Sequence, residues 1–211
     1  MGTSRFHKEA SLEPHIDHVR RITGKPVVSV GRFTSPETML SQVRRGIVDL
    51  IGAARPSIAD PFLPQKIREG RLDDIRECIG CNICYAHNSV GAPIRCTQNP
   101  TMGEEMRRGW HPERVPAAAS REQVLIVGAG PAGLEAAVTL GRRGVPVLLA
   151  EAEKELGGRV SRESRLPGFG EWARVRDWRV HQLSKLPSVE IFRGSRMQAA
   201  DVLATGARHV L

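Results

Sequence analysis

The sequence predicts an α/β protein with parallel β-sheets, and three observations support this fold class. Short apolar strands alternate with helical segments through residues 1–70. A strand, a glycine-rich turn and a helix follow one another from residue 124 onward, and a second strand comes after them. Four cysteines lie between these regions, within nineteen consecutive residues. Alternation of strand and helix is typical of a parallel sheet whose faces are covered by helices.

Local signals define the elements of the N-terminal region. Ser35 and Pro36 fit the N-cap and the first residue of a helix, because a Ser side chain caps free N–H groups and Pro needs no N–H there. Short apolar runs such as 25–30 predict strands. We therefore expect a helix over 12–22, a strand over 25–30, a helix from 36 to 46, a strand over 47–51 and a helix from 60 to 70.

The C-terminal region begins a new strand–helix–strand unit. We expect a buried strand over 124–127, a helix from Pro131 to Arg143 that ends at Gly144, and a second strand over 145–150. A stretch rich in Pro, Ala and Arg precedes this unit and is typical of a linker. The expected segments are 1–70, a cysteine segment 71–110, a linker 111–122 and a nucleotide-binding domain 123–211.

The composition is that of a globular protein without a membrane span. Of the 211 residues, 40% are hydrophobic and 26% are charged, and no apolar run is long enough to cross a bilayer. The first twelve residues mix charge, Gly and Ser and lack the apolar core of a secretory signal. We therefore expect a cytoplasmic protein that does not associate with membranes.

The chain is basic, with 31 Lys and Arg, 23 Asp and Glu, and a formal net charge of +8. Basic pairs such as Arg20-Arg21 and Arg142-Arg143 are scattered along the chain, and aromatic residues make up only 4%. Nucleic-acid binding favours a clustered basic surface or aromatic stacking platforms, so solvated helix faces are the better interpretation. An acidic protein partner or the phosphates of a cofactor also fit this charge.

The spacing Cys78-x2-Cys81-x2-Cys84-x11-Cys96 predicts a [4Fe–4S] cluster. A cubane cluster needs four thiolates around one compact body, and a tight loop can supply three of them while a separate segment supplies the fourth. In a reducing compartment, clustered cysteines indicate a metal site before disulfides. A structural zinc site is the alternative, although such sites favour two separated C-x2-C pairs.

The residues around the cysteines fit a cluster. Gly80 and Asn82 keep the loop small, so that backbone N–H groups can approach the sulfurs. Arg76 and Arg95 can offset the negative charge of a cluster.

Residues 128–133 fit the G-x-G-x-x-G fingerprint of a dinucleotide-binding turn in its required place between a strand and a helix. The first glycine makes the turn, the second lets a pyrophosphate approach the backbone, and the third packs the helix against the strand. The helix N-terminus offers N–H groups to the phosphate. The candidate contacts are Gly128, Gly130, Pro131, Ala132 and Gly133.

Glu151 follows the second strand, twenty-one residues after Gly130, where a carboxylate can accept hydrogen bonds from an adenosine ribose. The acid favours a bare ribose, as in FAD, ADP or NAD, over a ribose that carries a 2′-phosphate. Gly158 and Arg159 resemble the second glycine contact of flavin-binding folds with two dinucleotide domains. A tight turn with no ligand is the alternative.

Two further candidate sites follow the N-terminal strands. In a β/α barrel, the loops after the last two strands commonly form a phosphate site. Arg55 and the backbone around Gly31 and Ala54 are therefore candidates for the phosphate of FMN, with ordinary residues of the barrel rim as the alternative.

Five stretches of the chain are collinear with one protein family. They are KPVVSVGR at 25–32, IGAARPSIADP at 51–61, CIGCNIC at 78–84, CTQN at 96–99 and GAGPAG at 128–133. Together they resemble the trimethylamine dehydrogenase / 2,4-dienoyl-CoA reductase group of Old Yellow Enzyme-like flavoproteins.

The resemblance implies an FMN-binding TIM barrel, then a [4Fe–4S] segment, then a pair of nucleotide-binding domains. It assigns this chain to the C-terminal end of the β/α barrel, the iron–sulfur segment and the start of a Rossmann-like domain that binds FAD or ADP. By the same resemblance, Gly31, Arg32, Ala54 and Arg55 are FMN-phosphate contacts. The four cysteines are cluster ligands, and the glycine-rich turn with Glu151 is the FAD or ADP site.

Two branches of the family remain open. The two-residue gap between Cys81 and Cys84 and the sequence RGWHP at 108–112 resemble the amine dehydrogenases, which oxidise a small amine at FMN and pass electrons through the cluster to an electron-transfer flavoprotein. The dienoyl-CoA reductases usually have one more residue in that gap and take hydride from NAD(P)H. Asn88 stands where trimethylamine dehydrogenase has a substrate-facing Trp, which leaves the amine open.

The catalytic residues of the family lie upstream of residue 1, so no catalytic residue is assigned. The first region offers only two strands, and the chain stops at what looks like the start of another strand. We therefore expect the sequence to continue in both directions, the isolated chain to be inactive, and the full-length protein to be a homodimer. A stand-alone electron-transfer module is the alternative, although its strand edges would be left unpaired.

Overall fold

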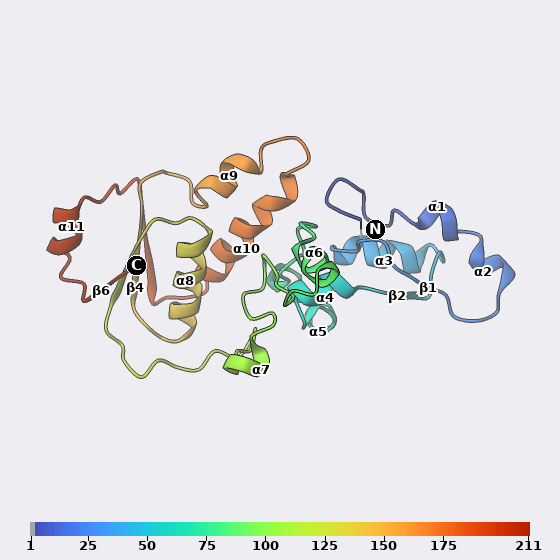
Figure 1. Ribbon diagram of the computed structural model, residues 1–211, viewed down its shortest axis with the longest axis horizontal. Coiled ribbons are helices and arrows are strands. Elements are labelled where there is room, and N and C mark those ends of the chain that lie inside the picture. Colours follow the sequence, from blue (N-terminus) through green and yellow to red (C-terminus); the bar gives the residue numbers. More distant parts are fainter. Residues whose placement is uncertain (1–2) are drawn as a thin grey trace. The chain divides into compact units, whose positions relative to one another are not determined.

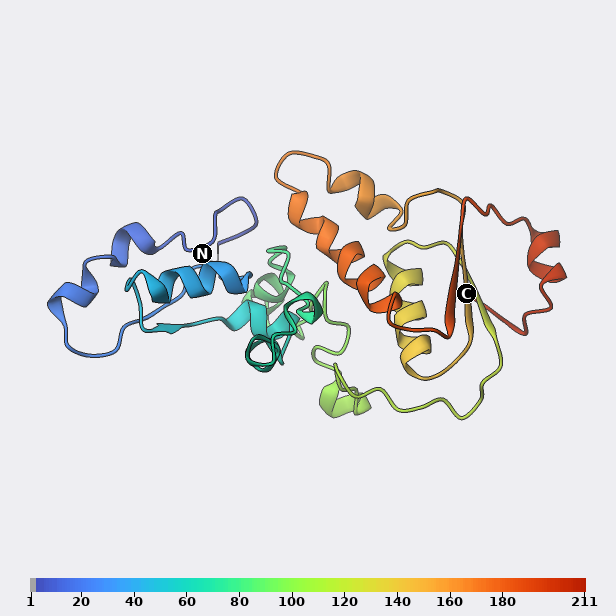
Figure 2. The same ribbon diagram turned by 180° about the vertical axis from the view of Figure 1, so that it is seen from behind.

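The computed structural model describes residues 3–211, and the chain divides into two compact units, Met1–Pro112 and Glu113–Leu211. Each unit contains its own parallel sheet (Figures 1 and 2). Within residues 3–211, no helix is both long and apolar enough to cross a membrane.

The first unit contains one pair of parallel strands. Val28 of the first strand pairs with Leu50 of the second, and Ser29 pairs with Ile51. In chain order its elements are α1 (Glu13–Ile16), α2 (Val19–Ile22), β1 (Val28–Ser29), α3 (Pro36–Arg44), β2 (Leu50–Ile51), α4 (Ala54–Ala59), α5 (Leu63–Arg68), the 3-10 turn η1 (Leu72–Asp74), α6 (Ile83–Ser89) and α7 (Glu105–Arg108).

Both strands are shorter than predicted, since each has only two paired residues. The apolar side chains of Val28, Val30 and Leu50 are exposed. Among the described residues, no third strand pairs with these two, so their outer edges and much of their faces are uncovered and residues suited to a buried strand remain at the surface.

The helices of the first unit agree with the sequence in part. The predicted helix over 12–22 is instead two single turns, α1 and α2, neither of which buries a residue. Short helices gain most of their stability from packing an apolar face, which these turns lack. The helix that begins at Pro36 is confirmed as α3. The helix expected from residue 60 begins at Leu63, and α4 was not predicted.

A small core holds the first unit together. It consists of Phe33, Met39, Leu63 and Ile75, which come from the segment between β1 and α3, from α3, from α5 and from the chain just before the cysteines. This core therefore anchors the segment that leads into the cysteine loop.

The second unit contains a four-stranded parallel sheet in the order β5-β4-β3-β6. This order places the first strand of the unit next to its second and fourth strands, as in a Rossmann-like half. Its elements are β3 (Val124–Val127), α8 (Pro131–Arg142), β4 (Val147–Glu151), α9 (Arg159–Glu163), the 3-10 turn η2 (Gly170–Trp172), α10 (Ala173–Leu183), β5 (Val189–Arg193), α11 (Ala199–Ala204) and β6 (His209–Val210). The predicted strand–helix–strand unit and the expected terminal strand are confirmed.

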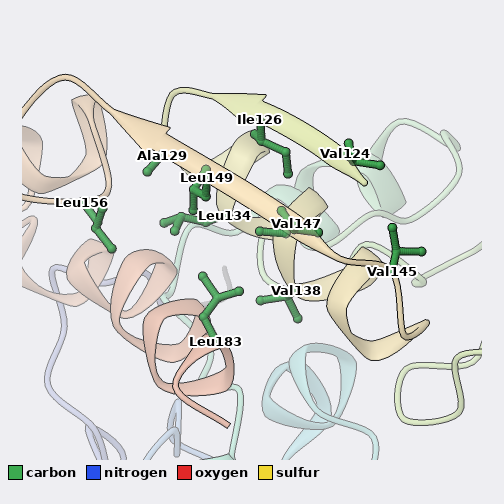
Figure 3. Close-up of a cluster of buried hydrophobic side chains, with 11 residues drawn as sticks. Val124, Ile126, Ala129, Leu134, Val138, Val145, Val147, Leu149, Leu156 and Leu183 are labelled. Carbon is green, nitrogen blue, oxygen red and sulfur yellow. The ribbon is translucent and has the colours of Figure 1, made fainter. Parts of the chain in front are cut away.

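The core of the second unit lies between the sheet and helices α8 and α10. Figure 3 shows apolar side chains of β3 and β4 directed toward those of the two helices. Leu134 and Leu149 are completely buried in this layer, each with 0% of its surface exposed. The packing fixes the turn between β3 and α8, which carries the glycine fingerprint.

Candidate functional site

Three of the four cysteines lie on the loop that leads into α6, and the fourth comes from a later segment. Cys78 and Cys81 precede the helix and are half-buried, whereas Cys84 lies in its first turn and is buried. Cys96 lies beyond the helix and is also half-buried. No disulfide joins any of these four cysteines. This is the division of ligands that the sequence spacing predicted for the candidate cluster.

Left-handed backbone keeps the cysteine loop compact. Gly80 has φ +63° and Asn82 has φ +60°, and the N–H of Gly80 donates to Sγ of Cys78 at 3.4 Å. A Cβ added at Gly80 would lie 2.9 Å from the backbone nitrogen of Arg5, so only glycine fits there.

The cysteines lie close enough to influence one another electrostatically. Burial raises the pKa of the Cys78 thiol to about 11, the N–H of Gly80 opposes this rise, and the neighbouring Cys96 and Cys81 add to it. Burial without compensation favours the neutral thiol, and a bound cation or cluster reverses this preference.

The fourth cysteine, Cys96, lies near the other three. Burial raises the pKa of Cys96, the N–H groups of Asn99 and Gln98 oppose this rise, and Cys81 and Cys84 add to it. Within residues 3–211, no group of three or more His, Cys, Asp or Glu side chains is arranged to hold a single metal ion.

The donor set nevertheless fits an iron–sulfur cluster. It consists of sulfur alone, it comes from a loop and a second segment, and backbone N–H groups of Gly80, Gln98 and Asn99 reach two of the sulfurs. In addition, Sγ of Cys81 lies 3.2 Å from Oγ1 of Thr97, which joins the loop to the second segment. Hydrogen bonds to sulfur are one of the means by which proteins tune such clusters.

The two arginines expected to offset a cluster's charge each have a side-chain partner near the cysteines. Nη1 of Arg76 donates to Oδ1 of Asn99 at 3.2 Å, and Nη2 of Arg95 pairs with Glu104 at 2.8 Å. A third cation, Arg55, has a charge that opposes the effect of burial on the pKa of Cys78.

Arg32 and Arg55, both predicted FMN-phosphate contacts, lie at the cysteine loop. Arg55 is half-buried and donates to the side-chain oxygen of Asn82 and to the carbonyl of Thr3. Arg32 is buried, and its Nη1 lies 2.9 Å from the position of a Cβ added at Gly80. Each guanidinium has several donors, so these contacts leave capacity for a phosphate.

The other two predicted phosphate contacts are backbone positions. Gly31 is buried, and its carbonyl accepts the N–H of Ala10 at 2.8 Å. Ala54 is exposed and opens α4.

Sequence reasoning missed the contribution of the N-terminal residues. Thr3 accepts hydrogen bonds from Arg55, and the N–H of Arg5 donates to the carbonyl of Gly80 at 3.2 Å. No local pattern marks these contacts, because they join segments far apart in the chain.

In the second unit, the glycine-rich turn has the geometry that the fingerprint predicts. Gly128 directly follows β3 and has φ +104°, and Gly130 is the N-cap of α8. A Cβ at Gly133 would lie 2.0 Å from the carbonyl oxygen of Gly128, whereas one at Gly130 would meet nothing within 4 Å. The space beside Gly130 is what a close approach by a pyrophosphate requires, and Pro131 and Ala132 follow it in the first turn of α8.

Glu151 lies at the same turn. It is buried, its Oε2 accepts the N–H of Ala129 at 2.7 Å, and its Oε1 accepts the N–H of Glu153 at 2.9 Å. A carboxylate oxygen can accept more than one hydrogen bond, so these contacts orient the group and leave acceptor capacity for a ribose.

The second glycine contact also reaches the turn. A Cβ at Gly158 would lie 3.4 Å from Cα of Gly130, and the N–H of Gly157 donates to the carbonyl of Ala129 at 2.8 Å. Arg159 begins α9, and its side chain pairs with Glu163 on the same helix.

Known families match both units. The family described as "NADH:flavin oxidoreductase / NADH oxidase family" matches residues 2–74, and "FAD dependent oxidoreductase" matches residues 123–204. Among curated proteins, dimethylamine dehydrogenase of Hyphomicrobium sp. (strain x) is 51% identical over 100% of this chain and 29% of its own length. NADH oxidase of Thermoanaerobacter brockii is 34% identical over 92% of this chain and 30% of its own length. The chain thus spans about three tenths of the length of these relatives.

Solved structures give the same result. Histamine dehydrogenase from Rhizobium sp. 4-9 is 56% identical with a TM-score of 0.96, over 99% of this chain and 30% of that structure. The 6-hydroxypseudooxynicotine amine oxidase from Pseudomonas geniculata N1 is 57% identical with a TM-score of 0.95, over 99% of this chain and 31% of that structure. The predicted fold class is therefore correct, and the first unit is part of a flavin-binding barrel. Residues 2–74 thus match the NADH:flavin oxidoreductase / NADH oxidase family, and the chain is similar to dimethylamine dehydrogenase over its whole length.

Proposed function

We propose that this chain is part of an FMN-dependent amine dehydrogenase that contains a [4Fe–4S] cluster. The observation that carries the proposal is the 51% identity with dimethylamine dehydrogenase over the whole chain. The names of the similar solved structures, a histamine dehydrogenase and an amine oxidase, also indicate amines as substrates.

In this proposal each segment has a separate task. Residues 1–70 are the last two βα units of the FMN barrel, 71–110 carry the cluster, 111–122 are a linker, and 123–211 begin the nucleotide-binding domain. In the linker segment, the N–H of Ala118 donates to the carbonyl of Arg143 at 3.0 Å, so this part of it belongs to the second unit.

The proposed cofactor contacts follow from the sites described above. Gly31, Arg32, Ala54 and Arg55 bind the FMN phosphate, and Cys78, Cys81, Cys84 and Cys96 bind the cluster. The FAD or ADP contacts are Gly128, Gly130, Pro131, Ala132, Gly133, Glu151, Gly158 and Arg159. When bound, the flavin accepts electrons from the substrate and the cluster carries them one at a time.

In the direction we propose, electrons leave the small-molecule amine at FMN, pass through the cluster and reach an electron-transfer flavoprotein. The reverse direction, in which NAD(P)H reduces an enoyl compound, is the second candidate. It is supported by the similarity to NADH oxidase and, at 32% identity, to a cinnamate reductase of Clostridium sporogenes. The two-residue gap between Cys81 and Cys84 favours the amine dehydrogenase.

The cluster assignment is tested on the chain itself after anaerobic reconstitution with iron and sulfide. We expect about four iron and four acid-labile sulfide per chain and a lower iron content in Cys84→Ser. A colourless protein that holds stoichiometric zinc would contradict the assignment.

The substrate is tested in the enzyme of which this chain is proposed to be a part. Under anaerobic conditions, we expect dimethylamine or histamine to bleach the flavin absorbance and NADH to leave it unchanged. Bleaching by NADH alone would select the reductase. By contrast, we expect the 211-residue chain alone to show no amine-dependent dye reduction.

The remaining features of the proposal are a cytoplasmic location and a homodimeric full-length enzyme that binds no nucleic acid. Gel filtration and light scattering of that enzyme test the dimer. A stand-alone electron-transfer module is the alternative of another class. A soluble isolated chain with a cooperative thermal transition would favour the module, and aggregation would favour the larger enzyme.

A further inference from the structure

Each of the two short gaps of the cysteine loop 78–84 contains one left-handed residue, and an arginine side chain lies close to each of them. Gly80 lies in the Cys78–Cys81 gap, and Asn82 lies in the Cys81–Cys84 gap, with φ +63° and +60°. Arg32 reaches the first of them and Arg55 reaches the second. These arginines follow β1 and β2, so two neighbouring strand ends hold one loop.

Arg55 holds the second gap by a set of hydrogen bonds. Its Nη1 donates to Oδ1 of Asn82 and to the carbonyl of Thr3, and its Nη2 donates to Oγ1 of Thr3 at 3.2 Å. A guanidinium is planar and always charged, so it fixes its partners and keeps its charge at any working pH. Its positive charge therefore lies beside the loop that carries the cysteines.

Arg32 lies at the first gap. It is only 7% exposed, and its own backbone is left-handed, with φ +56°. This conformation is unfavourable for a long side chain and persists where the surrounding structure fixes it. Its Nη1 lies so close to Gly80 that no Cβ would fit there. A second positive charge is therefore present at the loop.

We propose that Arg32 and Arg55 are positioning residues for the iron–sulfur cluster, which fix the two gaps of the cysteine loop and raise the reduction potential of the cluster. This inference rests on the proposed function, because it takes the four cysteines as the cluster ligands. It adds a role to the phosphate contacts proposed for the same side chains.

The charge of the cluster explains the expected change in potential. One-electron reduction adds a negative charge to a cluster that four thiolates already surround. A nearby positive charge stabilises the reduced form more than the oxidised form, so its removal makes the potential more negative. In the titration that measures this potential, the electron comes from dithionite.

The experiment compares reconstituted full chains of wild type, Arg55→Gln, Arg55→Lys and Arg32→Gln by redox titration with EPR detection. Arg71→Gln is the matched control, because Arg71 lies in the same unit but its side chain is 40% exposed and paired with Glu69. Iron and sulfide are counted in every sample, and titrations are repeated with and without FMN to separate any effect of the flavin.

We expect Arg55→Gln and Arg32→Gln to shift the midpoint potential to more negative values at unchanged iron content. Arg55→Lys, which keeps the charge, should lie closer to wild type, and Arg71→Gln should not shift. If Arg55→Gln does not retain iron, Arg32→Gln decides by the same measurement. Wild-type potentials in the glutamine variants that retain the cluster would overturn the inference. A wild-type chain that binds no iron would instead overturn the proposed function.

Discussion

The carboxylate of Glu151 accepts the backbone N–H of Ala129 at 2.7 Å, which ties the end of β4 to the middle of the glycine-rich turn. The carboxylate is thereby fixed beside the position where the fingerprint predicts a nucleotide. A buried acid held by two backbone N–H groups is already oriented before a ligand arrives, so binding requires little reorganisation there.

We predict that Glu151→Gln weakens ADP binding to the chain about tenfold or more, because a hydrogen bond to a charged acceptor contributes roughly 1.5–3 kcal/mol. The amide oxygen can still accept the N–H of Ala129, although the amide nitrogen cannot accept the N–H of Glu153, so most of the local structure should be retained. Isothermal titration calorimetry measures the affinity. Glu153→Gln is the control, since that side chain is 74% exposed. Equal affinities for wild type and Glu151→Gln would remove this residue from the nucleotide site.

Two alanine substitutions in the turn should separate folding from binding. A Cβ at Gly133 would lie 2.0 Å from the carbonyl of Gly128, so Gly133→Ala should destabilise the second unit by roughly 1–3 kcal/mol or more. A Cβ at Gly130 would meet nothing within 4 Å, so Gly130→Ala should fold normally and bind ADP more weakly.

Urea unfolding followed by circular dichroism, together with ADP titration, measures both effects. Gly170→Ala is the control, because a Cβ there also meets nothing within 4 Å. A Gly130→Ala variant that binds ADP like wild type would argue against a pyrophosphate at this turn.

A buried ion pair supports the approach to the cysteines. Nζ of Lys66 lies 2.7 Å from Oδ2 of Asp60, both side chains are 2% exposed, and the same oxygen accepts the N–H of Arg76 at 2.8 Å. Lys66→Met leaves the Asp60 carboxylate without its cation, so we predict a loss of about 3–5 kcal/mol in the free energy of unfolding.

The double variant Lys66→Met/Asp60→Asn should lose less, since no unpaired charge remains buried. Arg71→Met, which breaks an exposed pair with Glu69, should change stability by about 1 kcal/mol or less. Urea midpoints of the three variants test the order. A double variant as unstable as Lys66→Met would show that packing, and not charge, sets the cost.

The elements around the glycine-rich turn could be predicted from sequence because local signals agree there. Four apolar residues form β3, and α8 begins at the proline of the fingerprint. By contrast, α10 and β5 were not predicted. In α10 the buried Arg179 pairs with Glu135 of α8 at 2.8 Å, and such charged residues on a buried face hide the helical pattern.

The cysteine spacing could indicate the four residues of the candidate cluster site, but not the residues that hydrogen-bond to the cysteine loop. Thr3 and Arg55 are 52 residues apart in the sequence, and their hydrogen bond forms only when the folded chain brings the N-terminal segment next to the residues that follow β2. The same limit applies to Glu9, which bonds to the start of α3 from 25 residues upstream. Contacts of this kind leave no periodicity or local motif. That the four cysteines bind iron stays a prediction until the metal analysis is done.

Glu9 gives the stability of the first unit a dependence on pH. Burial raises the pKa of its carboxyl, but hydrogen bonds from the side chains and N–H groups of Thr34 and Ser35 outweigh burial, and the pKa is lowered from its ordinary value of 4.5. A carboxyl with a lower pKa in the folded state stabilises the fold above the ordinary value, and this contribution is lost as the pH falls through the folded pKa.

We therefore predict that Glu9→Gln lowers the free energy of unfolding of the metal-free, reduced chain by about 1–3 kcal/mol at pH 7. Urea unfolding measures this change. The difference from wild type should shrink as the pH falls from 7 to below 4, because the wild-type carboxyl becomes protonated. Glu37→Gln is the matched control. Glu37 lies in the first turn of α3, so both substitutions remove one negative charge from the same helix end. Unlike the side chain of Glu9, however, the side chain of Glu37 is exposed. A Glu9→Gln deficit that is constant with pH would mean that the shape of the side chain, and not its charge, holds the start of α3.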